Sequence, residues 1–107
     1  MMQITKWNIE GLNGYKPITT FWQDFDIADK FGVAAVQDTY RRAFREWKHN
    51  YKYLTELVLV LNHKAWQHVE TNPVLSEVYV TLFETADNYA INNLKGQELT
   101  YFFQVTD

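Results

Sequence analysis

Residues 72–96, NPVLSEVYVTLFETADNYAINNLKG, give the clearest evidence for the fold class of this chain. Asn72 is a residue type that caps helices, and Pro73 suits the first helical position because its missing N–H needs no partner there. Apolar residues then recur every three or four positions, as expected of a helix with one face turned to a core. These residues are Leu75, Val78, Tyr79, Leu82, Phe83, Ala86 and Tyr89. With Gly96 as its stop, the pattern predicts a helix over residues 73–95.

The same periodicity toward the N-terminus predicts three further helices, over residues 21–31, 33–49 and 51–70. Gly32 and Asn50 separate them, since both residue types tolerate the backbone conformations that end a helix. The helix over 51–70 is apolar over most of its circumference near the middle. Such a helix either is central in the fold or shares a second face with another subunit.

Both ends of the chain favour extended structure. Residues 3–9 are β-compatible, and residues 99–105 alternate apolar and polar side chains except at Phe102. We expect two short strands, paired as a small β-ribbon. Hydrophobic residues make up 47% of the chain and aromatic residues 17%, which is enough apolar material for one core. The sequence therefore predicts a mainly α, compact four-helix domain that takes in residues 1–107 as a single unit.

Composition restricts the location and the chemistry. The chain has no cysteine, so disulfides and thiolate metal sites are excluded. The longest strongly apolar run, residues 57–61, is far shorter than the roughly 20 residues of a membrane span. The opening residues 1–14 lack the basic-then-apolar layout of a signal peptide. We expect a cytoplasmic protein with no membrane partner.

Positive charge is concentrated in residues 41–52. This stretch has a net charge of +4, so the rest of the chain, whose total is −3, carries −7. The five cations are Arg41, Arg42, Arg45, Lys48 and Lys52. Cations near a helix C-terminus are favoured by the helix dipole, and Asp38 and Glu46 are spaced to pair with the arginines. A solvated helix face explains part of the pattern, but we expect this face to meet an acidic partner or nucleic acid.

Residues 26–33, DIADKFGV, resemble the first helix and turn of a DNA-binding helix-turn-helix. Ala28 would allow close helix approach, and Gly32 would permit the tight turn. The continuation does not fit, because Asp38 occupies the position where such motifs place an apolar residue. The motif is degenerate, and a helical corner without a DNA role fits it better than a DNA reader.

The motifs of enzymes and metalloproteins are missing from the sequence. His63 and His68 are five residues apart and fall on different helix faces, which disfavours joint coordination of a metal. The single serine, Ser76, lies on the first turn of an amphipathic helix without a glycine-flanked elbow. We therefore predict no catalytic residues, no cofactor and no metal, and a protein that is not an enzyme.

The helix over 51–70 offers a candidate protein interface. Leu59, Asn62 and Trp66 project together from it, away from the main apolar stripe. Left uncovered by the chain itself, they would form a patch for self-association, with Trp66 as the anchor. The alternative is that an end of the same chain covers them.

Six short stretches carry a resemblance: residues 19–32 (TTFWQDFDIADKFG), 38–40 (DTY), 47–48 (WK), 53–57 (YLTEL), 94–99 (LKGQEL) and 101–103 (YFF). Through them the chain resembles a group of small uncharacterised bacterial proteins of about this length, often found among phage-like and other mobile-element genes. The resemblance implies no activity or cofactor, only an accessory role in a mobile element. We predict a non-enzymatic accessory or protein-interaction domain for which self-association is one option, with a nucleic-acid-binding module as the alternative.

Overall fold

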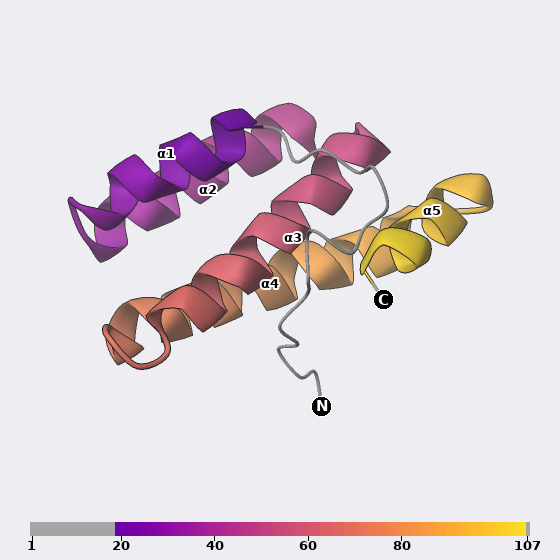
Figure 1. Cartoon of the computed structure of the whole chain (residues 1–107). Coiled ribbons are helices and arrows are strands. Elements are labelled where there is room, and N and C mark those ends of the chain that lie inside the picture. Colours follow the sequence, from indigo (N-terminus) through magenta and orange to yellow (C-terminus); the bar gives the residue numbers. More distant parts are fainter. Residues whose placement is uncertain (1–18, 107) are drawn as a thin grey trace.

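The computed structural model of the chain describes residues 19–106, and this part consists of five helices joined by short turns (Figure 1). They are α1 (Thr19–Asp29), α2 (Val33–Trp47), α3 (Tyr51–His68), α4 (Pro73–Asn93) and α5 (Gln97–Thr106). The predicted mainly helical fold is confirmed. The four helices expected from the periodicity correspond to α1–α4, with ends that agree within two residues. None of the described helices is long and apolar enough to cross a membrane.

The strand predicted for residues 99–105 is wrong, because this stretch lies in α5. Gly96 adopts a positive φ of 60° and its carbonyl accepts the backbone N–H of Thr100, which starts a new helix directly after α4. In a helix, Phe102 turns inward and is buried, whereas Phe103 is partly exposed. The other predicted strand, residues 3–9, lies outside the described residues, and no β-ribbon occurs within 19–106.

Side-chain caps begin the two longest helices, as the sequence indicates. The Oδ1 atom of Asn50 accepts the N–H of Tyr53 at 3.2 Å, and that of Asn72 accepts the N–H of Leu75 at 3.2 Å. Pro73 occupies the first turn of α4. Each cap satisfies an N–H group that has no partner inside its own helix.

The helices form two antiparallel pairs. Figure 1 shows α1 and α2 side by side as one pair, α3 and α4 side by side as the other, and α5 against one end of the second pair. The shared core lies between the pairs. Phe25 of α1 packs edge to face against Tyr79 of α4, with 5.8 Å between the two ring centres.

Helix α3 is central, as its apolar circumference predicts. Residues 54–62 are buried without interruption, and α3 contacts each of the other four helices. A helix covered on all sides must place polar residues inward as well as apolar ones. Lys64 is the largest of them, and its side chain is fully buried.

Candidate functional site

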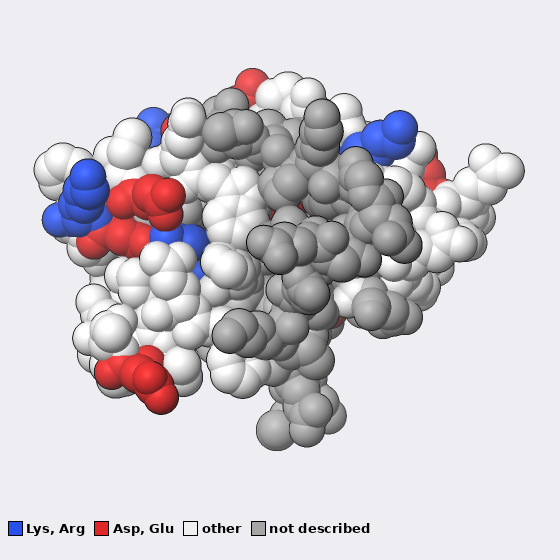
Figure 2. All heavy atoms as spheres, viewed as in Figure 1, with Lys and Arg blue, Asp and Glu red and all other residues white. Residues whose placement is uncertain are grey.

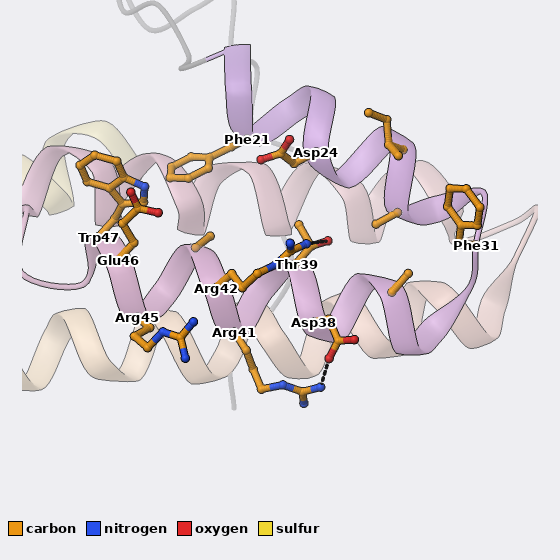
Figure 3. Close-up of a pocket in the computed structure, with 14 residues that line it drawn as sticks. Phe21, Asp24, Phe31, Asp38, Thr39, Arg41, Arg42, Arg45, Glu46 and Trp47 are labelled. Carbon is orange, nitrogen blue, oxygen red and sulfur yellow. Dashed lines mark hydrogen bonds and ion pairs between the residues drawn. The ribbon is translucent and has the colours of Figure 1, made fainter.

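The candidate site is a groove of about 860 Å³ between α1 and α2 (Figure 3). Fourteen side chains from these two helices and the turn between them line it. Gly32, with a φ of 104°, makes the turn that brings α2 back alongside α1. This backbone conformation is essentially restricted to glycine, so the local sequence directs the pairing of the two helices.

Small side chains leave the space that forms the groove. Ala28 of α1 and Ala43 of α2 are buried at its base, and Ala35 is half-buried. Figure 3 shows Phe21 and Trp47 at one end of the groove and Phe31 at the other. The result is a concave surface with an aliphatic floor and aromatic ends.

Two large apolar residues of the lining are left in solvent. Phe31 is 77% exposed and Ile27 is 55% exposed, while Phe21, Phe25 and Ala28 of the same segment are buried. Ile27 and Phe31 are four residues apart and form a second apolar stripe that the core does not use. Single exposed apolar residues are common, but two of them lining one concave surface make this groove the candidate interaction site.

Three predicted basic residues, Arg41, Arg42 and Arg45, line this groove together. All three are exposed, and Arg41 forms an ion pair with Asp38, as its spacing predicts. Nη2 of Arg42 donates to Oγ1 of Thr39 at 3.4 Å. The lining also contains Asp24, Asp38 and Glu46, so its formal net charge is zero.

The other two basic residues do not belong to the groove. The ammonium of Lys48 lies 5.9 Å from the centre of the Phe44 ring, and that of Lys52 lies 6.0 Å from the centre of the Tyr51 ring. Each of these two ammonium groups lies over a neighbouring aromatic ring, in a cation–π contact. The predicted basic face is therefore divided, with only its first three members in the groove.

The predicted interface on α3 is mostly inaccessible. Leu59 is 2% exposed and Asn62 is fully buried, whereas Trp66 is 37% exposed. Of the two alternatives left open by the sequence, an exposed patch made by all three residues is therefore wrong. Leu59 and Asn62 belong to the part of α3 that is buried on every side, and Trp66 lies past that part, toward the end of the helix.

The degenerate helix-turn-helix corner at residues 26–33 forms the tip of the α1–α2 pair. In Figures 1 and 3 the two helices run alongside each other. DNA-binding corners instead cross their helices at about 90–120°, so that the second helix can enter the major groove. Arg41, Arg42 and Arg45 lie in later turns of α2, away from the turns that usually read bases.

A second polar feature, which sequence reasoning missed, joins α1 to α3 and α4. Nζ of Lys64 lies 2.6 Å from Oδ1 of Asp26 and 2.6 Å from Oδ2 of Asp29. Nε2 of His68 lies 2.9 Å from Asp29 Oδ2, and the hydroxyl of Tyr79 donates to Asp29 Oδ1. We call these five residues the Asp29 cluster. Figure 2 shows acidic and basic side chains gathered over the C-terminal part of α1.

Hydrogen bonds keep the Asp29 carboxyl ionised. Burial alone would raise the pKa of Asp29, but hydrogen bonds from Lys64, Tyr79 and His68 outweigh it and hold the pKa below the ordinary 3.8. Burial and the neighbouring carboxylates of Asp29 and Asp26 raise the pKa of Tyr79. Because an ionised carboxylate can only accept hydrogen bonds, the Nε2–H of His68 is the donor in its hydrogen bond to Asp29 Oδ2.

The Asp29 cluster holds α1 against α3 and α4, which is a structural role. Its cation, Lys64, is fully buried and already bonded to two carboxylates. The position of His68 near the inner stripe of its helix predicts a satisfied histidine at the edge of the core, and its bond to Asp29 confirms this. A sequence signal existed, because Lys64 interrupts the apolar stripe of α3 while Asp26 and Asp29 share one face of α1. Within residues 19–106, no group of three or more acidic or histidine side chains is arranged to hold a metal.

Comparisons with models of protein families, with curated proteins and with solved structures found no match to this chain. The resemblance to bacterial mobile-element proteins therefore stays a prediction.

Proposed function

We propose that this chain is a non-enzymatic protein-interaction domain that binds another protein in the α1–α2 groove. The exposure of Phe31 and Ile27 inside a concave surface supports it. Covering apolar surface contributes about 25 cal/mol per Å², so a partner that seats apolar side chains there is stabilised. The proposal includes a cytoplasmic location and an accessory role in a mobile element, both of which rest on the sequence alone.

The second candidate is a nucleic-acid-binding module. The exposure of Arg41, Arg42 and Arg45 favours it, together with the net charge of +4 over residues 41–52. The balanced charge of the groove lining argues against it, because phosphate binding gains free energy from a surplus of cations. We therefore rank protein binding first.

Site-specific photo-crosslinking in the cells that make the protein tests the first candidate. A benzophenone side chain at position 31 should give a discrete adduct that protease destroys and nuclease leaves intact. A benzophenone at position 103 is the matched control, because Phe103 is a partly exposed phenylalanine on α5, outside the groove. The adduct at position 31 should disappear when Ile27→Asp is added.

Two outcomes would contradict protein binding in the groove. One is the same adduct from positions 31 and 103, which would mean that the crosslinking is non-specific. The other is no adduct at position 31 under conditions where the protein is folded and abundant. A nuclease-sensitive adduct would favour the second candidate.

A salt series of gel shifts tests the second candidate directly. Arginines that bind phosphates make the affinity fall steeply as salt rises, because binding releases counterions from the nucleic acid. Neutralising Arg41 and Arg45 should flatten that dependence, by about one unit of slope for each phosphate that is no longer neutralised. No binding to duplex or single-stranded nucleic acid at low salt would remove this candidate.

A further inference from the structure

The α1–α2 groove runs between two helices, an arrangement in which a third helix can pack. Its two walls are helices of 11 and 15 residues, about 16 and 22 Å long at 1.5 Å per residue. The alanines at its base let another backbone approach closely. An amphipathic helix that lies along two neighbouring helices packs its ridge of side chains into the groove between them.

The apolar contacts are spread along the groove. Phe31 lies at one end and Phe21 with Trp47 at the other, with Ile27 also in the lining (Figure 3). A ligand that reaches all of them needs apolar side chains at several successive positions. A helix with residues at i, i+3 or i+4, and i+7 on one face meets this requirement.

The two edges of the groove differ in charge. On the α2 edge, Asp38 is already paired with Arg41, whereas neither Arg42 nor Arg45 forms an ion pair with any residue in 19–106. On the α1 edge the charged residue is Asp24, which points into the groove (Figure 3). Glu46, the remaining acid, lies beside Trp47 at the end of the groove.

We infer that the partner presents an amphipathic helix with carboxylates along the flank that faces α2 and uncharged or basic residues along the flank that faces α1. This inference rests on the proposed function and adds the chemistry and orientation of the bound segment. The two arginines of α2 that have no ion pair within residues 19–106, Arg42 and Arg45, support it, because their uncompensated charge on one edge of the groove attracts a carboxylate row of the bound helix and fixes its orientation.

A displayed library of helix-forming peptides tests the inference against the full chain. Apolar residues are kept on one face, the two flanking rows are randomised, and the Phe31→Ser variant is used to remove peptides that bind elsewhere. We expect the surviving peptides to carry Asp or Glu on one flank only. The best of them is then synthesised for fluorescence anisotropy.

Charge reversal identifies the facing edge. Arg45→Glu should lower the affinity for the selected peptide by about fivefold to tenfold, since exposed ion pairs are worth up to about 1 kcal/mol and reversal adds repulsion. Exchanging the facing peptide carboxylate for Lys should restore binding to Arg45→Glu alone. The control is Lys95→Glu, which makes the same change in net charge at an exposed site past the end of α4.

The outcomes separate this inference from the proposal on which it rests. Selected peptides that need Phe31 but show no acidic flank, or that bind Arg45→Glu as well as the unchanged chain, overturn the inference and leave groove binding intact. A library from which no peptide depends on Phe31 overturns both. An equal weakening by Lys95→Glu would mean general electrostatics and also overturns the oriented arrangement.

Discussion

Among single residues, Lys64 occupies a position that tolerates little change. It is fully buried, and its charge is balanced by Asp26 and Asp29. Lys64→Met should lower the free energy of unfolding by about 2–3 kcal/mol, because removing one partner leaves the Asp29 carboxylate without its cation. Urea unfolding measures this. Lys30→Met, at an exposed lysine near the end of α1, is the control and should change stability by less than about 0.5 kcal/mol.

The depressed pKa of Asp29 makes stability depend on pH. Because this carboxyl holds its proton less tightly in the folded chain than in the unfolded one, the unfolded chain binds more protons as the pH falls. The stabilisation is complete above the ordinary carboxyl pKa of 3.8 and is lost as the pH falls through the lower folded value. Urea midpoints at pH 7 and pH 3 should therefore differ more for the unchanged chain than for Asp29→Asn.

The control for this pH effect is Asp24→Asn, which removes an exposed carboxyl of the same helix. The urea midpoint of Asp24→Asn should change between pH 7 and pH 3 by as much as that of the unchanged chain. If Asp29→Asn keeps the full difference, the acid sensitivity belongs to other carboxyls and the cluster has no part in it.

Turning to the helices and their connections, the turns at Gly32 and Gly96 differ in the conformation they need. Gly32 has a φ of 104° and a ψ of −170°, a region that only glycine occupies readily, and Gly96 has a φ of 60°. A Cβ at either position meets nothing within 4 Å, so an alanine would cost backbone strain alone. Gly32→Ala should destabilise by about 2–3 kcal/mol and Gly96→Ala by about 1 kcal/mol. Thermal unfolding that reverses this order would contradict the geometry of the first turn.

Adjacent phenylalanines report whether residues 97–106 are helical. In α5, Phe102 is buried and Phe103 is partly exposed. Phe102→Ala should lower the free energy of unfolding by about 3–4 kcal/mol, because it removes buried apolar surface and leaves a cavity. Phe103→Ala should lower it by about 1 kcal/mol or less. The alternating strand that the sequence favours would give the opposite order, with Phe103 inside. Chemical unfolding of the two variants distinguishes the structures.

The wrong prediction for this segment has a specific cause. Leu99, Tyr101, Phe103 and Val105 alternate, but Leu99, Phe102 and Thr106 also recur at helical spacing. Seven residues are too few to tell the two periods apart. Packing of Phe102 against the other helices settles the choice, and that packing joins residues far apart in the chain.

For the molecule as a whole, self-association through Trp66 stays a prediction. Trp66 and Val69 are exposed and three residues apart at the end of α3, so they offer a small apolar surface. If the chain self-associates there, light scattering reports a concentration-dependent dimer and Trp66→Ala shifts it toward monomer. Ile91→Ala, at another exposed apolar residue, should leave the distribution unchanged. A monomer for all three proteins would remove self-association.

The amino-acid sequence by itself determined where α1–α4 lie, since Gly32, Asn50, Asn72 and Pro73 act through local backbone geometry and apolar periodicity marks the inner faces. It also placed Arg41, Arg42 and Arg45 on an exposed face. Contacts between distant segments determined the rest. The burial of Leu59 and Asn62, the pairing of Lys64 with Asp26 and Asp29, and the groove between α1 and α2 depend on how the helices pack, and periodicity within one helix carries no information about its neighbours.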